Sequence, residues 1–236
     1  MSLPVAILAG GLATRLQPIT STIPKSLVEV AGRPFAEHQV ELLARHGLTD
    51  LVFLVAHLGD MVRDVLGDGS RLGVRIRYVF DGPVAQGTGG AIRAAVPELG
   101  DAFFVLYGDS YLECDYQAIE RAFVASGKSG LMTVCRNDDQ WDRSNVLMED
   151  GRIVRYDKVA KTSDMRHIDY GLGAFKASAF AGRPAAAFDL ASVFQTLLAN
   201  NDLAGFEVPT RFYEIGSPSG LAATRDYIAQ RETTSR

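Results

Sequence analysis

The stretch VAILAGGLATRLQPITSTIPK, residues 5–25, decides the fold that we expect for this chain. Its first four residues, Val5–Leu8, are apolar and typical of a buried strand. Gly10 and Gly11 follow, and without Cβ atoms they let backbone N–H groups turn toward an anion. The glycine pair by itself is equally typical of a tight turn between a strand and a helix. The residues around the glycine pair are therefore needed to distinguish an anion site from a tight turn.

Short apolar runs alternate four times with amphipathic stretches in the first half of the chain. We expect buried strands at residues 5–8, 51–55, 75–80 and 103–107. We expect helices at residues 35–46, 60–66, 90–96 and 115–125, the third stopping before Pro97 and the fourth capped by Asp115. This alternation predicts an α/β fold, a Rossmann-like and mostly parallel sheet with helices on both faces. Ligands of such sheets bind outside the carboxyl ends of the strands.

The second half of the chain changes character and predicts an inserted mixed β region. Strands are expected at residues 130–135, 168–175 and 212–215, and a hairpin over residues 145–157 turns at residues 149–151. Helices are expected at residues 190–199 and 218–230, the second capped by Ser217. Gly171 and Gly173 within one strand predict a close backbone approach by a ligand or another chain. No linker or repeat separates the halves, so we expect residues 1–236 to form one domain.

The composition restricts the classes of protein to which the chain can belong. It has 236 residues, of which 47% are hydrophobic and 22% charged, as in ordinary globular proteins. No apolar run approaches the roughly 18 residues of a membrane span, so we expect no membrane partner. The net charge of −4 disfavours a nucleic-acid partner but allows a local basic site for a small anion. The oligomeric state, including a homo-oligomer, stays open.

The cysteines and the N-terminus bear on the cellular compartment. Cys114 and Cys135 are too few for a disulfide framework, and we expect reduced thiols, with one disulfide left open. The N-terminal residues carry no basic region ahead of an apolar one, so we expect no secretory signal. Both observations favour a cytoplasmic protein.

Two cations follow the glycine pair. Arg15 and Lys25 stand ten positions apart on a loop stiffened by Pro18 and Pro24, an arrangement that suits a polyphosphate. The spacing is neither the G-x-x-x-x-G-K-S/T of a P-loop nor the G-x-G-x-x-G of a dinucleotide site. A P-loop NTPase and an NAD enzyme are therefore disfavoured.

Residues 9–35, AGGLATRLQPITSTIPKSLVEVAGRPF, resemble the signature of the sugar-1-phosphate nucleotidylyltransferases, which include guanylyl-, uridylyl- and thymidylyltransferases. The spacing agrees throughout, with Ala13 where many members have Gly and Ser26 where many have Pro. The resemblance implies that Arg15 and Lys25 are catalytic. It also implies nucleotide contacts from four residues of this run, namely Ala9, Gly10, Gly11 and Thr14.

A second run, QGTGGA at residues 86–91, resembles the family's glycine motif near the nucleobase. The resemblance implies that Gln86, Gly87 and Thr88 bind the nucleotide. From the residues alone, glycines that open a helix form either a surface of backbone donors or a flexible helix end.

Two carboxylates resemble the family's metal ligands. Asp109 follows the strand at residues 103–107, where an Asp by itself is equally suited to cap a turn. Glu214 stands where the family has Asp, and its extra methylene leaves direct ligation or ligation through a water open. The resemblance implies that Asp109 and Glu214 hold Mg²⁺, which Mn²⁺ can replace.

The sugar side of the site is expected in the second half of the chain. Lys158 resembles the family lysine that contacts the sugar-linked phosphate, and Asp169, Tyr170 and Gly171 resemble its sugar pocket. Trp141 is suited either to stack on a sugar or to anchor packing. Residues 1–125 are then expected to govern the NTP and residues 126–236 the sugar phosphate.

The resemblance implies an enzyme that joins an NTP and a sugar 1-phosphate into an NDP-sugar and pyrophosphate. The glycine run GTGGAI most resembles that of the heptose-1-phosphate guanylyltransferases, with the muramic-acid-type uridylyltransferases next, which implies GTP with a heptose or hexose 1-phosphate. Three alternatives stay open: a UTP-dependent uridylyltransferase on an amino-sugar 1-phosphate, a cytidylyltransferase on a non-sugar alcohol phosphate, and a non-catalytic nucleotide-binding regulatory subunit.

Overall fold

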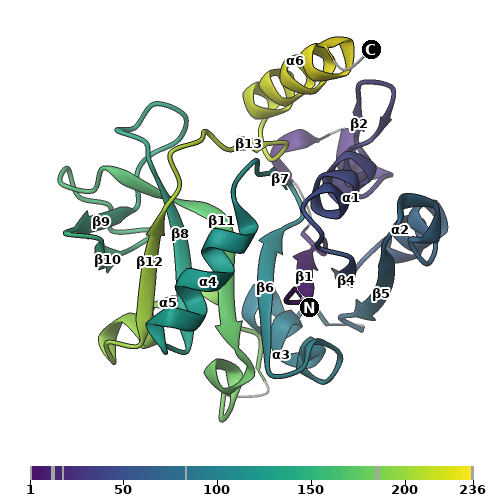
Figure 1. Cartoon of the computed structure of the whole chain (residues 1–236). Helices are drawn as coiled ribbons and strands as arrows, with labels where there is room; N and C mark the ends of the chain where they lie inside the picture. The colour runs from purple at the N-terminus through teal and green to yellow at the C-terminus, as the bar shows by residue number, and fades with distance from the viewer. Residues whose placement is uncertain (1, 12–13, 18, 83, 184–185, 235–236) are drawn as a thin grey trace.

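A nine-stranded sheet runs through the computed structural model, which describes residues 2–11, 14–17, 19–82, 84–183 and 186–234 (Figure 1). Four parallel strands form one side of it, in the order β5-β4-β1-β6. Their bounds are β1 (Val5–Leu8), β4 (Asp50–Val55), β5 (Arg75–Phe80) and β6 (Ala102–Tyr107). The chain order reverses between β1 and β6, so the switch point where such sheets bind ligands lies at the carboxyl ends of these two strands.

Helices cover both faces of the sheet. Side chains of successive β1 residues point to opposite faces, so Val5 and Ile7 belong to one hydrophobic cluster and Ala6 to another. The first cluster includes helices α1 (Phe35–Arg45), α2 (Gly59–Leu66) and α4 (Tyr116–Ser126), and the second includes α3 (Gly87–Leu99) and α5 (Leu190–Ala199). This arrangement confirms the predicted α/β architecture.

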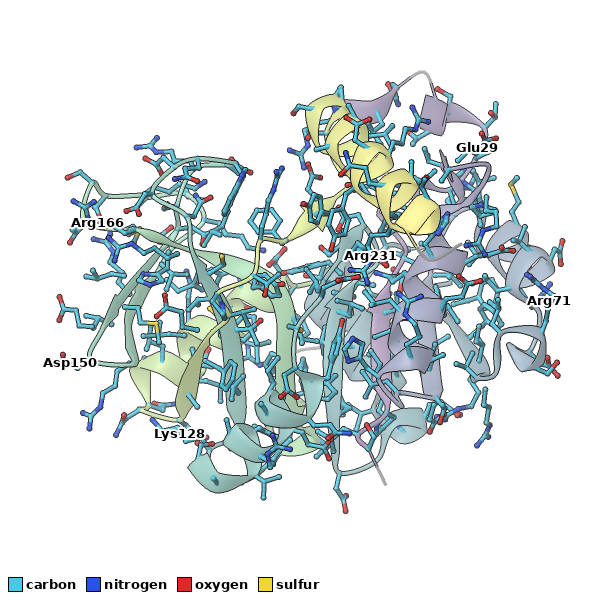
Figure 2. The ribbon with its side chains drawn as sticks, turned by 45° about the horizontal axis from the view of Figure 1, so that its top comes forward. Glu29, Arg71, Lys128, Asp150, Arg166 and Arg231 are labelled. Carbon is cyan, nitrogen blue, oxygen red and sulfur yellow. The ribbon has the colours of Figure 1, made fainter. Side chains whose placement is uncertain are left out.

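The inserted mixed β region is also confirmed. Strand β11 (His167–Lys176) pairs antiparallel with β6 on one side and β8 (Gly130–Arg136) on the other. Strands β9 (Val146–Glu149) and β10 (Arg152–Tyr156) form the predicted hairpin, with Asp150 at its tip (Figure 2). Strand β12 (Leu203–Glu207) pairs parallel with β8 and was not expected, because its sequence LAGFE shows no alternation of apolar and polar residues.

Short elements connect the two halves above the strand ends. Strand β7 (Ser110–Tyr111) pairs with β13 (Tyr213–Glu214), and β2 (Glu29–Val30) pairs with β3 (Arg33–Pro34). Helix α6 (Pro218–Thr234) follows β13 and packs over β2 (Figures 1 and 2). Five 3-10 helices complete the described elements: η1 (Thr14–Leu16), η2 (Ile19–Ser21), η3 (Lys25–Leu27), η4 (Ser70–Leu72) and η5 (Ala177–Phe180).

Two of the predicted helix caps are confirmed, and the predicted bounds of one helix are wrong. Asp115 caps α4 by accepting a hydrogen bond from Ala118 N at 2.8 Å, and Ser217 Oγ caps α6 by accepting one from Gly220 N at 3.0 Å. The expectation that α3 spans residues 90–96 is wrong, because it begins at Gly87 and continues through Pro97. Pro97 lies in the last turn of the helix, which ends at Leu99 before the capping residue Gly100.

Two further expectations concern the membrane and the cysteines. Among the helices of the described residues, none is long and apolar enough to cross a bilayer. Cys114 and Cys135 are both buried and unpaired, which agrees with the expected free thiols.

Candidate active site

The first of two cavities lies at the carboxyl ends of β1, β4 and β6, and we call it the strand-end cavity. Its volume is about 270 Å³. Seven residues with a predicted role line it: Ala9, Gly10, Gly11, Lys25, Gly87, Thr88 and Asp109. The Thr14 side chain, Ala13 and Pro18 lie outside the described residues. The cavity therefore occupies the switch point and brings together the two glycine motifs that are far apart in the sequence.

Two glycines of the strand-end cavity show different reasons for lacking a side chain. A Cβ on Gly108 would lie 2.6 Å from Leu8 O, so Gly108 lets the ends of β1 and β6 approach each other. A Cβ on Gly11 would meet nothing within 4 Å. Packing explains Gly108, whereas the space beside Gly11 is open to a ligand.

The second cavity lies between β11, the segments that flank the β9–β10 hairpin and the start of α6, and we call it the hairpin-side cavity. Its volume is about 830 Å³. All four residues predicted to bind the sugar phosphate line it, namely Lys158, Asp169, Tyr170 and Gly171. Arg15 and Glu214 line it as well. Tyr107 and Asp109 line both cavities, so the two cavities meet at the carboxyl end of β6.

Opposite charges converge where the cavities meet. Lys25 Nζ donates a hydrogen bond to Asp109 Oδ2 at 2.7 Å. The pairing of β13 with β7 places Glu214 opposite Ser110, next to Asp109. A Cβ on Gly216 would lie 2.7 Å from Glu214 Oε2, 3.0 Å from Asp109 Oδ2 and 3.3 Å from Arg15 Nη2. The predicted cations and both predicted metal carboxylates therefore surround one point.

The glutamate that replaces the family's aspartate is accommodated by a second glycine. Glu214 Oε1 accepts a hydrogen bond from Ser217 Oγ at 2.6 Å, and Glu214 Oε2 accepts one from Gly216 N. A Cβ on Gly220 would overlap the Glu214 carboxylate. The longer side chain thus fits because residue 220, one turn into α6, has no side chain. Sequence reasoning missed Gly220, although a glycine in a first helical turn is a signal of close approach.

The turn that carries Asp109 is held by a buried glutamine. Gln39 Nε2, on α1, donates hydrogen bonds to Tyr107 O at 3.0 Å and to Ser110 O at 2.7 Å. Gln39 is 1% exposed. Its contribution is to fix the backbone on both sides of Gly108 and Asp109, so that the carboxylate stays between the cavities.

The sugar-side residues form a connected group around Tyr107. Lys158 Nζ donates to Tyr107 Oη at 3.2 Å and lies 4.0 Å from Asp189 Oδ1. Asp169 Oδ2 accepts from Tyr156 Oη at 3.1 Å. Burial raises the pKa of the Asp169 carboxyl, and Lys158 opposes that rise. Burial also raises the pKa of the Tyr107 phenol well above its usual value, so the phenol keeps its proton.

Part of the second glycine motif packs against protein. The N–H groups of Gly89 and Gly90 both donate to Phe188 O, at 2.9 and 3.3 Å. Gln86 Nε2 donates to Val84 O at 3.0 Å. The expectation that this motif offers free backbone donors is therefore wrong for Gly89 and Gly90. Gly87 and Thr88 still line the strand-end cavity.

Of the two glycines of β11, Gly171 faces a cavity and Gly173 packs against the core. Gly171 has a φ of +96° at a register shift in the strand and lines the hairpin-side cavity. A Cβ on Gly173 would lie 2.8 Å from the Phe175 ring and 3.0 Å from the Phe194 ring. The expectation of a ligand or another chain at Gly173 is therefore wrong, because aromatic side chains of the core fill that space.

A carboxylate that sequence reasoning did not single out lies in the strand-end cavity. Asp81 follows β5 and lines the cavity, and its Oδ2 accepts a hydrogen bond from Gln86 N at 3.3 Å. Within the described residues no cation pairs with it. Burial raises its pKa. In the sequence, DGP at residues 81–83 is typical of a turn and carries no other signal.

Comparisons with known proteins show the fold and the family of the chain. A crystal structure of a putative glucose-1-phosphate thymidylyltransferase from Bacillus anthracis superposes with a TM-score of 0.85, covering 96% of this chain and 95% of that chain at 21% identity, which shows the fold. The chain is 31% identical to mannose-1-phosphate guanyltransferase beta-B of Xenopus laevis over 72% of this chain and 48% of that protein. It is 40% identical to N-acetylmuramate alpha-1-phosphate uridylyltransferase of Neisseria meningitidis over 48% of this chain and 49% of that protein.

The chain spans about half the length of both relatives. A family model described as nucleotidyl transferase matches residues 5–149, which include β1, the glycine motifs, Lys25 and Asp109. The match covers more than half of the chain, and it contains the complete wall of the strand-end cavity. The chain therefore belongs to the nucleotidyl transferase family.

Proposed function

We propose that this chain joins an NTP and a sugar 1-phosphate into an NDP-sugar and pyrophosphate. The observation that carries the proposal is the meeting of two cavities at Asp109 and Tyr107, with Lys25 and Arg15 beside that point. A transfer between two anionic substrates needs two sites that open onto one set of cations. The names of the relatives, which act on sugar 1-phosphates, support the same substrate class.

The reaction proposed is a single displacement. An oxygen of the sugar 1-phosphate attacks the α-phosphorus of the NTP, a new P–O bond forms, and the bond from the α-phosphorus to the bridging oxygen of pyrophosphate breaks. The attacking oxygen is already an anion, so no general base is required. Catalysis then consists of positioning and of neutralising charge. Lys25 and Arg15 are assigned to the transferring phosphate, and Lys158 to the phosphate of the sugar.

The charged centre also fits a magnesium ion. Mg²⁺ prefers carboxylate oxygens and substrate phosphates, and commonly takes only one or two carboxylates from the protein. Asp109 and Glu214 supply two, and no group of three or more His, Cys, Asp or Glu side chains suited to a metal occurs among the described residues. Bound there with phosphates, the ion would withdraw charge from them. Lys25 would then turn from Asp109 toward the substrate.

GTP is the nucleotide that the strand-end cavity supports best. The Asp81 carboxylate only accepts hydrogen bonds, and no cation pairs with it in the described residues. Guanine offers two adjacent donors, N1–H and the 2-amino group, which suit the two oxygens of one carboxylate. Uracil offers one N–H between two carbonyls, so a carboxylate there would face a carbonyl oxygen. We therefore assign Asp81 to the guanine edge.

A nucleotide panel tests the base assignment. GTP should exceed UTP in kcat/KM, and inosine triphosphate, which lacks the 2-amino group, should fall between them. Asp81→Asn should lower kcat/KM for GTP by roughly tenfold to a hundredfold, the loss expected for one bidentate base contact. The same substitution should change kcat/KM for UTP little. A wild-type preference for UTP would assign the chain to the uridylyltransferases instead.

A pyrophosphate-release assay tests the reaction itself. Release should require an NTP, a sugar 1-phosphate and Mg²⁺ together. Lys25→Met should lower kcat by roughly 10²–10³-fold, as expected for removing one preorganised charge from a transition state. Near-normal turnover by a folded Lys25→Met protein would contradict the proposal. Full nucleotide binding without release by the wild-type chain would favour a regulatory subunit.

A further inference from the structure

Among the described residues, no carboxylate pairs with Arg211, an arginine in the wall of the hairpin-side cavity. Arg211 precedes β13, and its guanidinium carbon lies 5.2 Å from the centre of the Trp141 ring and 4.8 Å from that of Tyr213. Both rings belong to the cavity wall. Two aromatic faces therefore hold the planar guanidinium in a fixed position at the side of the cavity.

No carboxylate of the described residues neutralises this guanidinium. Within the part of the chain that the structure describes, Arg211 makes no ion pair, and its Nε is buried without a hydrogen-bond partner. The acidic residue nearest to it in sequence within the cavity, Glu214, has its own partners: its Oε1 accepts from Ser217 Oγ at 2.6 Å and its Oε2 from Gly216 N. Leaving a buried donor unpaired is unfavourable. A guanidinium that is held in place yet unpaired is suited to a ligand that supplies the acceptor.

Arg211 makes other contacts than the cations at the charged centre. Arg15 Nη2 lies by Gly216, as do Asp109 Oδ2 and Glu214 Oε2, whereas Arg211 lies over Trp141 and Tyr213. Lys158 lies by Tyr107, at the junction of the two cavities. The phosphate at C1 of the sugar is matched by the junction cations, because its oxygen has to reach the α-phosphorus there. Arg211 is then free for another group of the same substrate.

We propose that Arg211 binds a second anionic group, a carboxylate or a phosphate, on the sugar 1-phosphate substrate. The inference rests on the proposed function and narrows its substrate to acidic sugar 1-phosphates. A guanidinium donates two parallel hydrogen bonds to either group, and this geometry fits planar carboxylate and phosphate oxygens alike. Trp141 and Tyr213 would keep the plane of the guanidinium fixed while its edge faces the anion.

The test compares sugars that differ by one charged group. The first series is glucose 1-phosphate, glucuronic acid 1-phosphate and glucose 1,6-bisphosphate, and the second is the same set with mannose. Binding is followed by fluorescence of Trp141, the only tryptophan of the chain. In at least one series, an acidic member should bind at least tenfold more tightly than the neutral one. The carboxylate and bisphosphate members show which anion is preferred.

Arg211→Gln should abolish that preference and leave the affinity for the neutral member near that of the wild type. Lys161→Gln is the matched control, because Lys161 is a cation of the same cavity whose Nζ donates to Arg143 O at 2.9 Å. It should retain the wild-type preference. Equal wild-type affinities for neutral and acidic members would overturn the inference, and so would a loss in Arg211→Gln that is the same for all members. Turnover of neutral sugar phosphates in that case would leave the proposed function standing.

Discussion

Replacing Gly220 by alanine tests how the structure accommodates Glu214. A Cβ at residue 220 would overlap Glu214 Oε1 and Cδ, and because real Cβ contacts are not shorter than 3.0 Å, the carboxylate has to move by more than about 1 Å. A misplacement of about 1 Å at a reacting centre costs on the order of 10²-fold in rate. That corresponds to roughly 2.7 kcal/mol of transition-state stabilisation. Gly220→Ala should therefore lower kcat by roughly 10²-fold.

The thermal midpoint should fall as well, because the Cβ would also lie 2.8 Å from the backbone oxygen of Glu214. The rate is therefore measured well below that midpoint, where the variant is folded. Asp226→Ala is the matched control, since Asp226 is exposed on the same helix. It should change neither the thermal midpoint nor kcat appreciably.

A second substitution should rescue the first. Glu214→Asp removes one methylene and withdraws the carboxylate from Gly220, so the double variant Glu214→Asp, Gly220→Ala should exceed Gly220→Ala in kcat by at least about tenfold. Contacting residues typically show coupling of about 0.5–3 kcal/mol in such cycles. The assay is initial-rate pyrophosphate release at saturating substrates. Strictly additive losses, or wild-type turnover by Gly220→Ala, would refute the placement of the Glu214 carboxylate.

Three further predictions concern individual side chains. Gly11→Ala should fold with an unchanged thermal midpoint, because its Cβ would meet nothing within 4 Å, but it should raise KM for the NTP; an unchanged KM would show that no ligand uses that space. Asp81→Asn should raise the thermal midpoint at pH 7, since burial raises the pKa of this carboxyl above 3.8 and its ionisation therefore opposes folding. That gain should shrink as the pH is lowered toward 3.8, and a gain that grows instead would contradict the sign. Lys158→Ala should raise KM for the sugar 1-phosphate and leave KM for the NTP nearly unchanged in a two-substrate kinetic matrix; the opposite pattern would reverse the assignment of the two cavities.

The parallel half of the fold was predictable because each signal is local. Val5–Leu8 is apolar throughout, as a strand buried on both faces must be, and the glycines after it mark the turn. The same holds for the caps at Asp115 and Ser217, since a cap bonds an N–H within three residues. No local signal predicts strand β12, because it forms by pairing with β8, which is distant in the sequence.

The residues of the candidate site also fall into two groups, those that a local motif predicts and those that only the fold reveals. Residues quoted from motifs, such as Lys25, Asp109 and Lys158, line the cavities, and their roles stay predictions. Asp81 and Arg211 do not stand in any motif. What distinguishes them is that no opposite charge among the described residues pairs with them, which only the folded chain shows. Gly89 shows the converse: a motif glycine whose N–H donates to Phe188 O across a long stretch of sequence.

The most direct test of the central claim is phosphorus NMR of the reaction between GTP and a sugar 1-phosphate labelled with ¹⁸O in its non-bridging oxygens. If the sugar phosphate attacks the α-phosphorus at the junction of the two cavities, all of the ¹⁸O should remain in the NDP-sugar, with part of it bridging the α- and β-phosphorus, and the pyrophosphate should be unlabelled. Label in the pyrophosphate, or GMP and GDP as the only nucleotide products, would contradict the proposed transfer.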